Sequence, residues 1–137
     1  MCKHEERQEE KMKIELERLT LKNTFQLQQI IKKEIAEQAY LEWPFTKQVA
    51  EHFIVNYNTY GIWVNGGVLV GAIEVKQDGE TAYLISPQWQ NKGIATFAVK
   101  ECIKHFNNQQ LWCYINPNNK ASLRVARKAN LRVQFYK

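Results

Sequence analysis

The chain has 137 residues, of which 45% are hydrophobic and 24% charged, and this balance predicts one folded domain rather than a disordered or two-domain protein. Its formal net charge of +5 suits an anionic ligand, such as a phosphorylated cofactor or a nucleic acid, but solubility alone explains the charge equally well. Three cysteines without a framework spacing, and no apolar run near the ~20 residues of a membrane span, exclude a disulfide scaffold and a transmembrane protein and favour a cytoplasmic one.

The first part of the chain predicts a strand followed by two helices. Residues 1–12 are charged and rich in glutamate, so we expect a flexible extension, or a start of translation further along, before a single domain at residues 13–137. Alternating apolar residues predict an edge strand from Ile14 to Thr20. Apolar residues at helical spacing predict a helix from Asn23 to Ala39, and Thr46 can cap a second helix.

Two turn dipeptides divide the middle of the chain into three short strands. Asn65-Gly66 and Asp78-Gly79 are strong signals for tight hairpin turns. The strands that they join are expected at residues 62–64, 68–76 and 81–86. Strands joined in this way form an antiparallel meander, so the centre of the fold is not a doubly wound nucleotide-binding sheet.

The last third of the chain alternates helix and strand. The predicted elements are a helix with a broad apolar face from Ile94 to Phe106, a strand from Leu111 to Ile115, a helix from Asn118 or Asn119 to Asn130, and a strand from Leu131 to Tyr136. Because a helix separates residues 81–86 from residues 111–115, these two strands are expected to be parallel neighbours. The whole order predicts an α/β sandwich with a mixed sheet.

A glycine leads from a short loop into the helix that begins at Ile94. The first four N–H groups of a helix lack intrahelical partners, and the helix dipole adds partial positive charge there, so a helix start can bind phosphate oxygens. Gly93 removes the side chain that would block a ligand, Ala95 keeps the next turn open, and Lys92 adds a positive charge. The alternative interpretation is structural: Gly93 only makes a turn, and Ala95 only lets the helix pack closely on the sheet.

The segment Gln90-Asn91-Lys92-Gly93-Ile94-Ala95 resembles motif A of the GNAT superfamily of N-acetyltransferases, whose pattern is Gln or Arg, two residues, Gly, one residue, and Gly or Ala. Asn119-Lys120-Ala121-Ser122, followed by Ala129-Asn130-Leu131, resembles the family's second signature. The resemblance implies a GNAT-like mixed sheet with a central antiparallel meander, a parallel splayed pair of strands at the cofactor site, and helices on both faces. The chain is most similar to the branch that acetylates the N-terminal amines of ribosomal proteins.

The resemblance also implies which residues bind acetyl-coenzyme A (acetyl-CoA). The pyrophosphate loop would consist of Asn91, Lys92, Gly93, Ile94, Ala95 and Thr96. The backbone of Tyr83, Leu84 and Ile85 would pair with the pantetheine arm as an added strand does. Asn119 would contact the cofactor beyond the pyrophosphate.

The catalytic groups are marked less clearly than the cofactor loop. Many relatives place a catalytic glutamate where Glu80 begins its strand, so Glu80 is the first candidate for the base, Glu74 is the second, and a water relay is the third. Ala126 stands where relatives often carry an acidic tyrosine and Tyr114 where some carry a carboxylate, which leaves Ser122 as the candidate proton donor. Each candidate also has a structural reading: Glu80 as an exposed residue beside a hairpin, and Ser122 as a hydroxyl that satisfies a backbone group.

Together these features predict an acetyl-CoA-dependent N-acetyltransferase that acts on a primary amine, either a protein N-terminus or a small-molecule amine, by direct transfer. The alternative is a non-catalytic acyl-CoA-binding or interaction module, because two positions lack the family's reactive groups. A nucleic-acid-binding domain is the third hypothesis, since the charge supports it but no recognition motif does.

The remaining expectations concern metals and partners. We expect no metal site, because the three histidines are scattered without a ligand spacing, and we expect no membrane partner. Many relatives continue past the last helix with a two-stranded hairpin, whereas only residues 131–137 follow here. Either a second subunit supplies the missing strand in a homodimer, or the sheet ends one strand early.

Overall fold

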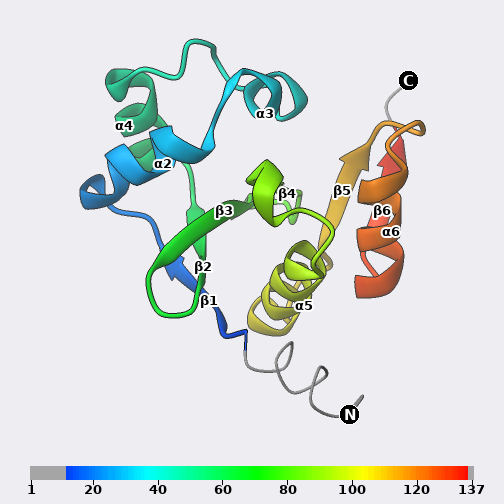
Figure 1. The fold of residues 1–137 in the computed structure, drawn as a ribbon. Coiled ribbons are helices and arrows are strands. Elements are labelled where there is room, and N and C mark those ends of the chain that lie inside the picture. Colours follow the sequence, from blue (N-terminus) through cyan, green and yellow to red (C-terminus); the bar gives the residue numbers. More distant parts are fainter. Residues whose placement is uncertain (1–11, 136–137) are drawn as a thin grey trace, which may run out of the picture.

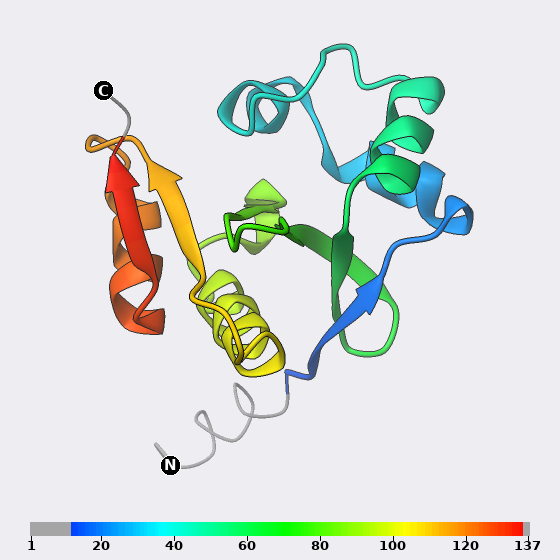
Figure 2. The same cartoon turned by 180° about the vertical axis from the view of Figure 1, so that it is seen from behind.

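In a computed structural model, residues 12–135 form two small β-sheets that touch at one point, with helices on both faces (Figures 1 and 2). The predicted α/β fold class is thereby confirmed. Residues 1–11 and 136–137 lie outside the described part of the chain. Most of the predicted N-terminal extension, and Tyr136 as the predicted end of the last strand, therefore fall outside it as well.

The described elements run in the order strand, three short helices, three strands, helix, strand, helix and strand. They are β1 (Ile14–Arg18), a 3-10 turn (Leu21–Asn23), α2 (Thr24–Ile30), α3 (Lys33–Gln38), α4 (Lys47–Asn56), β2 (Thr59–Val64), β3 (Val68–Val75), β4 (Thr81–Ile85), a 3-10 turn (Pro87–Trp89), α5 (Ile94–His105), β5 (Trp112–Ile115), α6 (Lys120–Ala129) and β6 (Arg132–Phe135). No helix among them has both the length and the apolar character that crossing a membrane would require.

Strands β1 to β4 form an antiparallel sheet in sequence order. The turn between β2 and β3 has left-handed backbone at both Asn65 (φ 49°) and Gly66 (φ 80°), as a two-residue hairpin turn requires. The turn between β3 and β4 closes with a hydrogen bond from the Gly79 N–H to the Lys76 carbonyl at 2.9 Å, and Gly79 has φ 92°. Both predicted hairpin turns are confirmed.

Strand β3 is buried on both faces, which explains why it is apolar along most of its length. Leu69 and Ala72 contribute to the core beneath α2, α3 and α4. Val70, Ile73 and Val75 contribute to the core on the opposite face, which α5 and α6 share. The antiparallel sheet thus separates two cores. Leu69 and Ala72 are three positions apart and still reach the same core, because the pairing of β2 with β3 shifts register between Ile62 and Trp63.

The single helix predicted from Asn23 to Ala39 is wrong, because this segment forms two helices. Helix α2 ends at Ile30, Ile31 has extended backbone (φ −91°, ψ 94°), and α3 begins at Lys33. Two adjacent β-branched residues favour extended backbone at the break, and Ile31 is 1% exposed there. Burial in the tertiary structure therefore outweighs the local helical periodicity.

Strand β2 begins at Thr59, three residues before the strand predicted at residues 62–64. Gly61 concealed this start, because glycine is disfavoured inside a strand. A Cβ atom at Gly61 would lie 2.6 Å from the indole nitrogen of Trp63, so the packing of Trp63 requires glycine at this position. A close side-chain contact in the folded protein thus explains why a glycine stands inside strand β2.

Strands β5 and β6 pair in parallel as a second sheet. It connects to the first sheet through a parallel bridge between Trp112 and Glu80, the residue just before β4, where the Trp112 N–H donates to the Gly79 carbonyl at 3.1 Å. Beyond this bridge β4 and β5 separate, as the two opposite views show (Figures 1 and 2). The predicted splayed parallel pair is confirmed, and the opening between its strands is the feature that positions the site.

Candidate functional site

Two helix starts flank the opening between β4 and β5. The strands run parallel, so the loops at their carboxyl ends, which lead into α5 and α6, emerge at the same edge. Ligands of α/β proteins commonly bind at this edge. The predicted pantetheine-binding residues Tyr83, Leu84 and Ile85 occupy the part of β4 where β5 no longer pairs with it.

The loop after β4 is held in a tight conformation by its own hydrogen bonds. The Trp89 N–H donates to the Ser86 carbonyl at 2.9 Å within a 3-10 turn. The side-chain amide of Gln90, the first residue of the recognised motif, donates to the Ile85 carbonyl at 3.0 Å. This bond ties the loop to the end of β4, so the start of α5 is placed at a defined position beside the opening.

The start of α5 presents four backbone N–H groups that the described protein does not use. Asn91 (φ 62°) and Gly93 (φ 81°) have left-handed backbone, and the first bond of the helix runs from the Phe97 N–H to the Gly93 carbonyl at 3.0 Å. Among residues 12–135, no acceptor takes a hydrogen bond from the N–H groups of Gly93, Ile94, Ala95 and Thr96. The donors expected at a helix start are therefore open.

These donors are also accessible. A Cβ atom at Gly93 would meet no heavy atom within 4 Å, and the side chains of Asn91 and Lys92 are exposed. Ile94 is 1% exposed and anchors the first turn of α5 in the core. A fixed helix start with open N–H groups, a positive dipole and a lysine beside it has the chemistry needed to bind a diphosphate.

Asn119 is the N-cap of α6. Its side-chain oxygen accepts a hydrogen bond from the Ser122 N–H at 3.1 Å, which stabilises the helix start. Within the described residues no hydrogen bond engages the Asn119 side-chain NH₂ group. Asn119 can therefore cap α6 and donate to a ligand at the same time.

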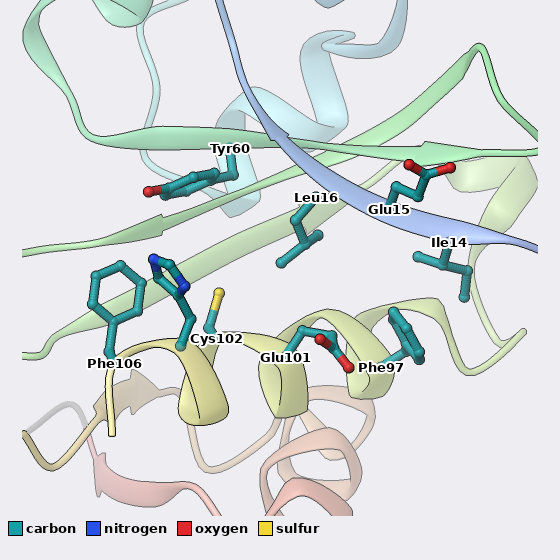
Figure 3. Close-up of a pocket in the computed structure, with 9 residues that line it drawn as sticks. Ile14, Glu15, Leu16, Tyr60, Phe97, Glu101, Cys102 and Phe106 are labelled. Carbon is teal, nitrogen blue, oxygen red and sulfur yellow. The ribbon is translucent and has the colours of Figure 1, made fainter. Parts of the chain in front are cut away.

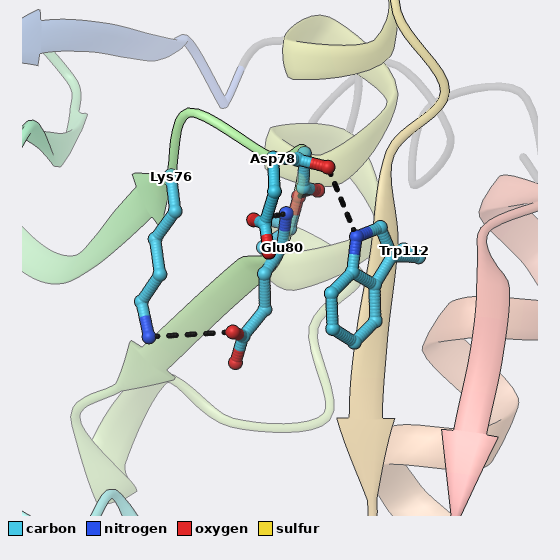
Figure 4. Close-up of polar contacts among 6 residues, drawn as sticks. Lys76, Asp78, Glu80 and Trp112 are labelled. Carbon is cyan, nitrogen blue, oxygen red and sulfur yellow. Dashed lines mark hydrogen bonds and ion pairs between the residues drawn. The ribbon is translucent and has the colours of Figure 1, made fainter.

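Glu80 lies at the closed end of the opening, next to the bridge with Trp112 (Figure 4). Its carboxylate forms an ion pair with the Lys76 ammonium at 3.4 Å, and its side chain is 21% exposed. The Glu80 N–H donates to the Asp78 carboxylate at 2.9 Å, and the Trp112 indole donates to the Asp78 carbonyl at 3.1 Å. Glu80 is therefore a held, largely covered carboxylate rather than a freely solvated residue beside a hairpin.

Glu74 is the second carboxylate near this end. It pairs across the sheet with Ala82 of β4 and so shares the face of the sheet that α2, α3 and α4 cover. Burial raises the pKa of the Glu74 carboxyl, while Lys76 lowers it and Glu80 raises it. The two candidate bases thus interact with each other and with one lysine, although they belong to neighbouring strands.

The side chain of Tyr83 packs against the core that α5 and α6 share, a position that the sequence did not predict. Its phenol oxygen is buried and has no hydrogen-bond partner within residues 12–135. Burial raises the pKa of the phenol, the nearby Ser122 hydroxyl lowers it, and Cys113 raises it. The sequence assigned only the backbone of Tyr83 to the site, and no signal in its pattern indicated that the side chain would face α6.

A groove of about 410 Å³ lies elsewhere, between β1 and α5 (Figure 3). Its lining residues are Ile14, Glu15, Leu16, Tyr60, Phe97, Glu101, Cys102, His105 and Phe106. None of them belongs to the predicted cofactor or catalytic set. In the part of the chain that the structure describes, no three His, Cys, Asp or Glu residues gather as metal ligands.

A family model described as an acetyltransferase (GNAT) domain matches residues 13–132. The chain belongs to the GNAT acetyltransferase family. The resemblance found in the sequence is confirmed, and with it the expectation of an N-acetyltransferase whose co-substrate is acetyl-CoA. No curated protein sequence matches the chain significantly.

Solved structures of other GNAT proteins share the fold. The microcin C7 self-immunity acetyltransferase MccE, in complex with acetyl-CoA and AMP, superposes with a TM-score of 0.70 at 17% identity, covering 85% of this chain and 77% of its own. A GNAT-family acetyltransferase from Bacillus anthracis gives 0.69 at 19% identity, covering 87% and 80%. A chimeric spermidine N-acetyltransferase SpeG from Vibrio cholerae and hSSAT gives 0.64 at 14% identity, covering 85% and 78%. At these identities the similarity shows the fold alone.

Proposed function

We propose that this GNAT protein transfers an acetyl group from acetyl-CoA directly to a primary amine, within a complex that holds both substrates. The observation that carries the proposal is the set of four open N–H groups at the start of α5, beside the splayed strands. The pyrophosphate would bind residues 91–96, and the pantetheine arm would extend along Tyr83, Leu84 and Ile85. Asn119 would donate to the cofactor from the second helix start.

Direct transfer is favoured over a covalent acetyl-enzyme because the described thiols are poor nucleophiles. Cys102 and Cys113 are free and buried. Burial raises the pKa of each thiol to about 11, with Glu101 adding to the effect at Cys102 and Glu80 at Cys113. A thiol that is protonated at neutral pH and shielded from solvent does not attack a thioester.

The acceptor amine would approach the closed end of the opening, where Glu80 lies. Transfer requires a neutral amine, so a carboxylate must accept a proton, and the held carboxylate of Glu80 has this chemistry. Glu74 offers the same chemistry one strand away, with a carboxyl that burial has already made more basic. Ser122, at the start of α6, is the proposed donor to the departing thiolate.

The acceptor would be a protein N-terminus or a small-molecule amine. The solved structures that share this fold include a microcin self-immunity acetyltransferase and a spermidine N-acetyltransferase chimera. Members of one fold can thus act on different substrates, so the acceptor has to be found by direct screening. The predicted homodimer and cytoplasmic location stay predictions, and sedimentation of the purified chain tests the first.

Calorimetric titration with CoA, followed by a thiol-release assay with acetyl-CoA and a panel of amines, tests the proposal. The panel should include peptides with free N-termini, polyamines and aminoglycosides. We expect CoA binding and amine-dependent thiol release with at least one class. Binding without release across the panel and a broad pH range would favour the non-catalytic module, and a folded chain that does not bind CoA would remove the cofactor premise.

A further inference from the structure

Strand β1 is an edge of the antiparallel sheet, and its bonds to β2 show which of its backbone groups stay open. The Lys13 carbonyl accepts a hydrogen bond from the Asn65 N–H at 2.9 Å. Peptide groups alternate in direction along a strand, so the odd-numbered residues bond to β2, whereas the N–H and C=O groups of Ile14 and Leu16 point away from the sheet. Within residues 12–135 no strand pairs with this outer edge.

The side chains along this edge separate into an apolar face and a charged face. Met12, Ile14 and Leu16 pack against the core that α5 and α6 share, and Figure 3 shows Ile14 and Leu16 pointing toward α5. Successive side chains of a strand point to opposite faces, so Lys13 and Glu15 share the other face. They form an ion pair there at 3.9 Å, and their side chains are 75% and 54% exposed.

The groove of about 410 Å³ between β1 and α5 runs beside this edge (Figure 3). Ile14 and Leu16 contribute to one wall of the groove, and Phe97 and Glu101 contribute to the other. Phe97 is 38% exposed there. In the described part of the chain no strand lies beyond β1 to cover the groove. A strand added at this edge would pair with the open backbone groups and bury the apolar side chains.

The order of charges favours a second copy of this chain as the added strand. In an antiparallel pair with Ile14 on the two-fold axis, Ile14 lies opposite its own copy, Lys13 lies opposite Glu15, and Met12 lies opposite Leu16. Opposite charges then meet twice on one face, and apolar side chains meet on the other. The outward-pointing backbone groups also lie opposite each other, so they can form hydrogen bonds between the copies.

The other registers centred within β1 place like charges opposite each other. Centring the pair on Glu15 or Glu17 places a glutamate opposite its own copy, and centring it on Arg18 does the same with an arginine. Centring it on Leu16 places Glu15 opposite Glu17. Like charges directly opposite each other destabilise an antiparallel pair. The segment Lys13-Ile14-Glu15 thus determines both the partner and the register.

We propose that the chain forms a two-fold homodimer through β1, in which the two antiparallel sheets join and each copy covers the groove of the other. Because β1 is short, the interface is small, and we expect a dimer dissociation constant of about 1–100 μM. Strands β1 and β4 are the opposite edges of the sheet, so the dimer leaves the opening beside β4 free. The interface differs from the C-terminal strand exchange that the sequence suggested.

Charge reversal tests the register by sedimentation equilibrium of the full chain. We expect Lys13→Glu and Glu15→Lys each to raise the dissociation constant at least about 10-fold, because each sets like charges opposite each other twice. An equimolar mixture of the two variants should dimerise, since every glutamate then meets a lysine. The double variant should dimerise for the same reason. Lys128→Glu on α6 changes the net charge as Lys13→Glu does and should keep the dimer.

Cross-linking tests the position of the two-fold axis, in a Cys2→Ser background where the other thiols, Cys102 and Cys113, are buried. Ile14→Cys places two thiols opposite each other with Cα atoms about 5.5 Å apart, within the range of a disulfide. In the same register the two copies of Leu16 lie about 14 Å apart, beyond that range. Mild oxidation should therefore cross-link Ile14→Cys and not Leu16→Cys.

Three results would overturn the inference. A wild-type chain that stays monomeric up to about 500 μM would leave the β1 edge to a strand of another protein. A dimer that Lys13→Glu leaves intact would have its interface elsewhere, for example in the C-terminal sheet. Cross-linking of Leu16→Cys without Ile14→Cys would exclude the register. None of these results affects the proposed function, because CoA binding tests that separately and should be equal in Lys13→Glu and wild type.

Discussion

Glu80 and Trp112 pair in parallel at the one place in residues 12–135 where a backbone bridge joins the two sheets. The Trp112 N–H bonds to the Gly79 carbonyl and the Trp112 indole to the Asp78 carbonyl, each at 3.1 Å. The turn before β4 is thus bonded to the first residue of β5, and the strands part beyond it. This junction sets the closed end of the opening and holds the candidate base beside it.

Gly79→Ala tests the junction. A Cβ atom at Gly79 would lie 2.4 Å from the Gln110 carbonyl oxygen, and φ 92° adds strain for any side chain. We expect a loss of more than about 2 kcal/mol in the free energy of unfolding, measured with urea. Gly66→Ala is the control, because Gly66 has φ 80° and an open surrounding, so it should lose only about 1 kcal/mol. Equal losses of stability in the two variants would show that the close approach of Gln110 to Gly79 does not add to the cost of a side chain there.

Gly93→Glu tests the diphosphate site. A glutamate here would place a bulky negative group where nothing now lies within 4 Å, so we expect CoA affinity to fall at least about 100-fold by calorimetry. Gly66→Glu is a close match, because φ is 80° at Gly66 and 81° at Gly93 and both positions are open. Each variant should lose about 1–2 kcal/mol of stability, and only Gly93→Glu should lose binding. Normal CoA affinity in Gly93→Glu would place the ligand elsewhere.

Two variants of Asn119 separate its capping role from its role toward the cofactor. Asn119→Ala removes the acceptor of the Ser122 N–H and should cost about 1 kcal/mol of stability in urea unfolding. Asn119→Asp keeps a good cap, so stability should be retained, but it replaces the side-chain NH₂ donor with a negative charge. CoA affinity should fall in both variants. An Asn119→Asp chain with unchanged affinity would show that Asn119 only caps α6.

Glu80→Gln identifies the base. The amide keeps the shape of the side chain but cannot accept a proton, so kcat should fall about 10²-fold while CoA affinity is retained. Glu74→Gln provides the comparison on the neighbouring strand and should lower kcat less. Steady-state rates with the best amine decide between the two. The reverse order would make Glu74 the base, and small effects in both variants would point to a water relay.

The raised pKa of the Glu74 carboxyl predicts that the stability of the native protein depends on pH, and Glu74→Gln tests this. Burial raises the pKa of the Glu74 carboxyl, so the native state holds this proton more tightly than the unfolded chain does. Native stability therefore falls as pH rises from the unfolded pKa to the folded pKa. The variant lacks this loss, so its Tm should exceed that of wild type at pH 7 and match it below about pH 4. Thermal unfolding between pH 3 and pH 8 checks this, and a difference independent of pH would exclude titration of Glu74 as the cause.

The local features were predictable from the sequence because each depends on a few neighbouring residues. Asn65-Gly66 predicted a hairpin turn because both residues tolerate positive φ, and both have it. Asn119 predicted a helix start because its short side chain can accept from a following N–H, and it does. The open N–H groups after Gly93 follow from the same rule, since every helix start leaves such donors.

The features that depend on distant residues were not predictable from the sequence. The break at Ile31 comes from burial beneath the sheet. Glycine at position 61 leaves room for Leu19, 42 positions earlier, whose side chain would lie 2.9 Å from a Cβ atom there. The parallel bridge between Glu80 and Trp112 joins residues 32 positions apart along the chain. No periodicity records such a pairing.

By itself, the sequence determined the order of the strands and of the last two helices, the two hairpin turns and the family of the protein. The tertiary structure alone decided where β4 leaves β5 and which carboxylate is held by Lys76. The physical reason is the distance along the chain over which each interaction acts. Backbone preferences act over a few residues, whereas a site between two strands exists only after non-local pairing has placed their edges side by side.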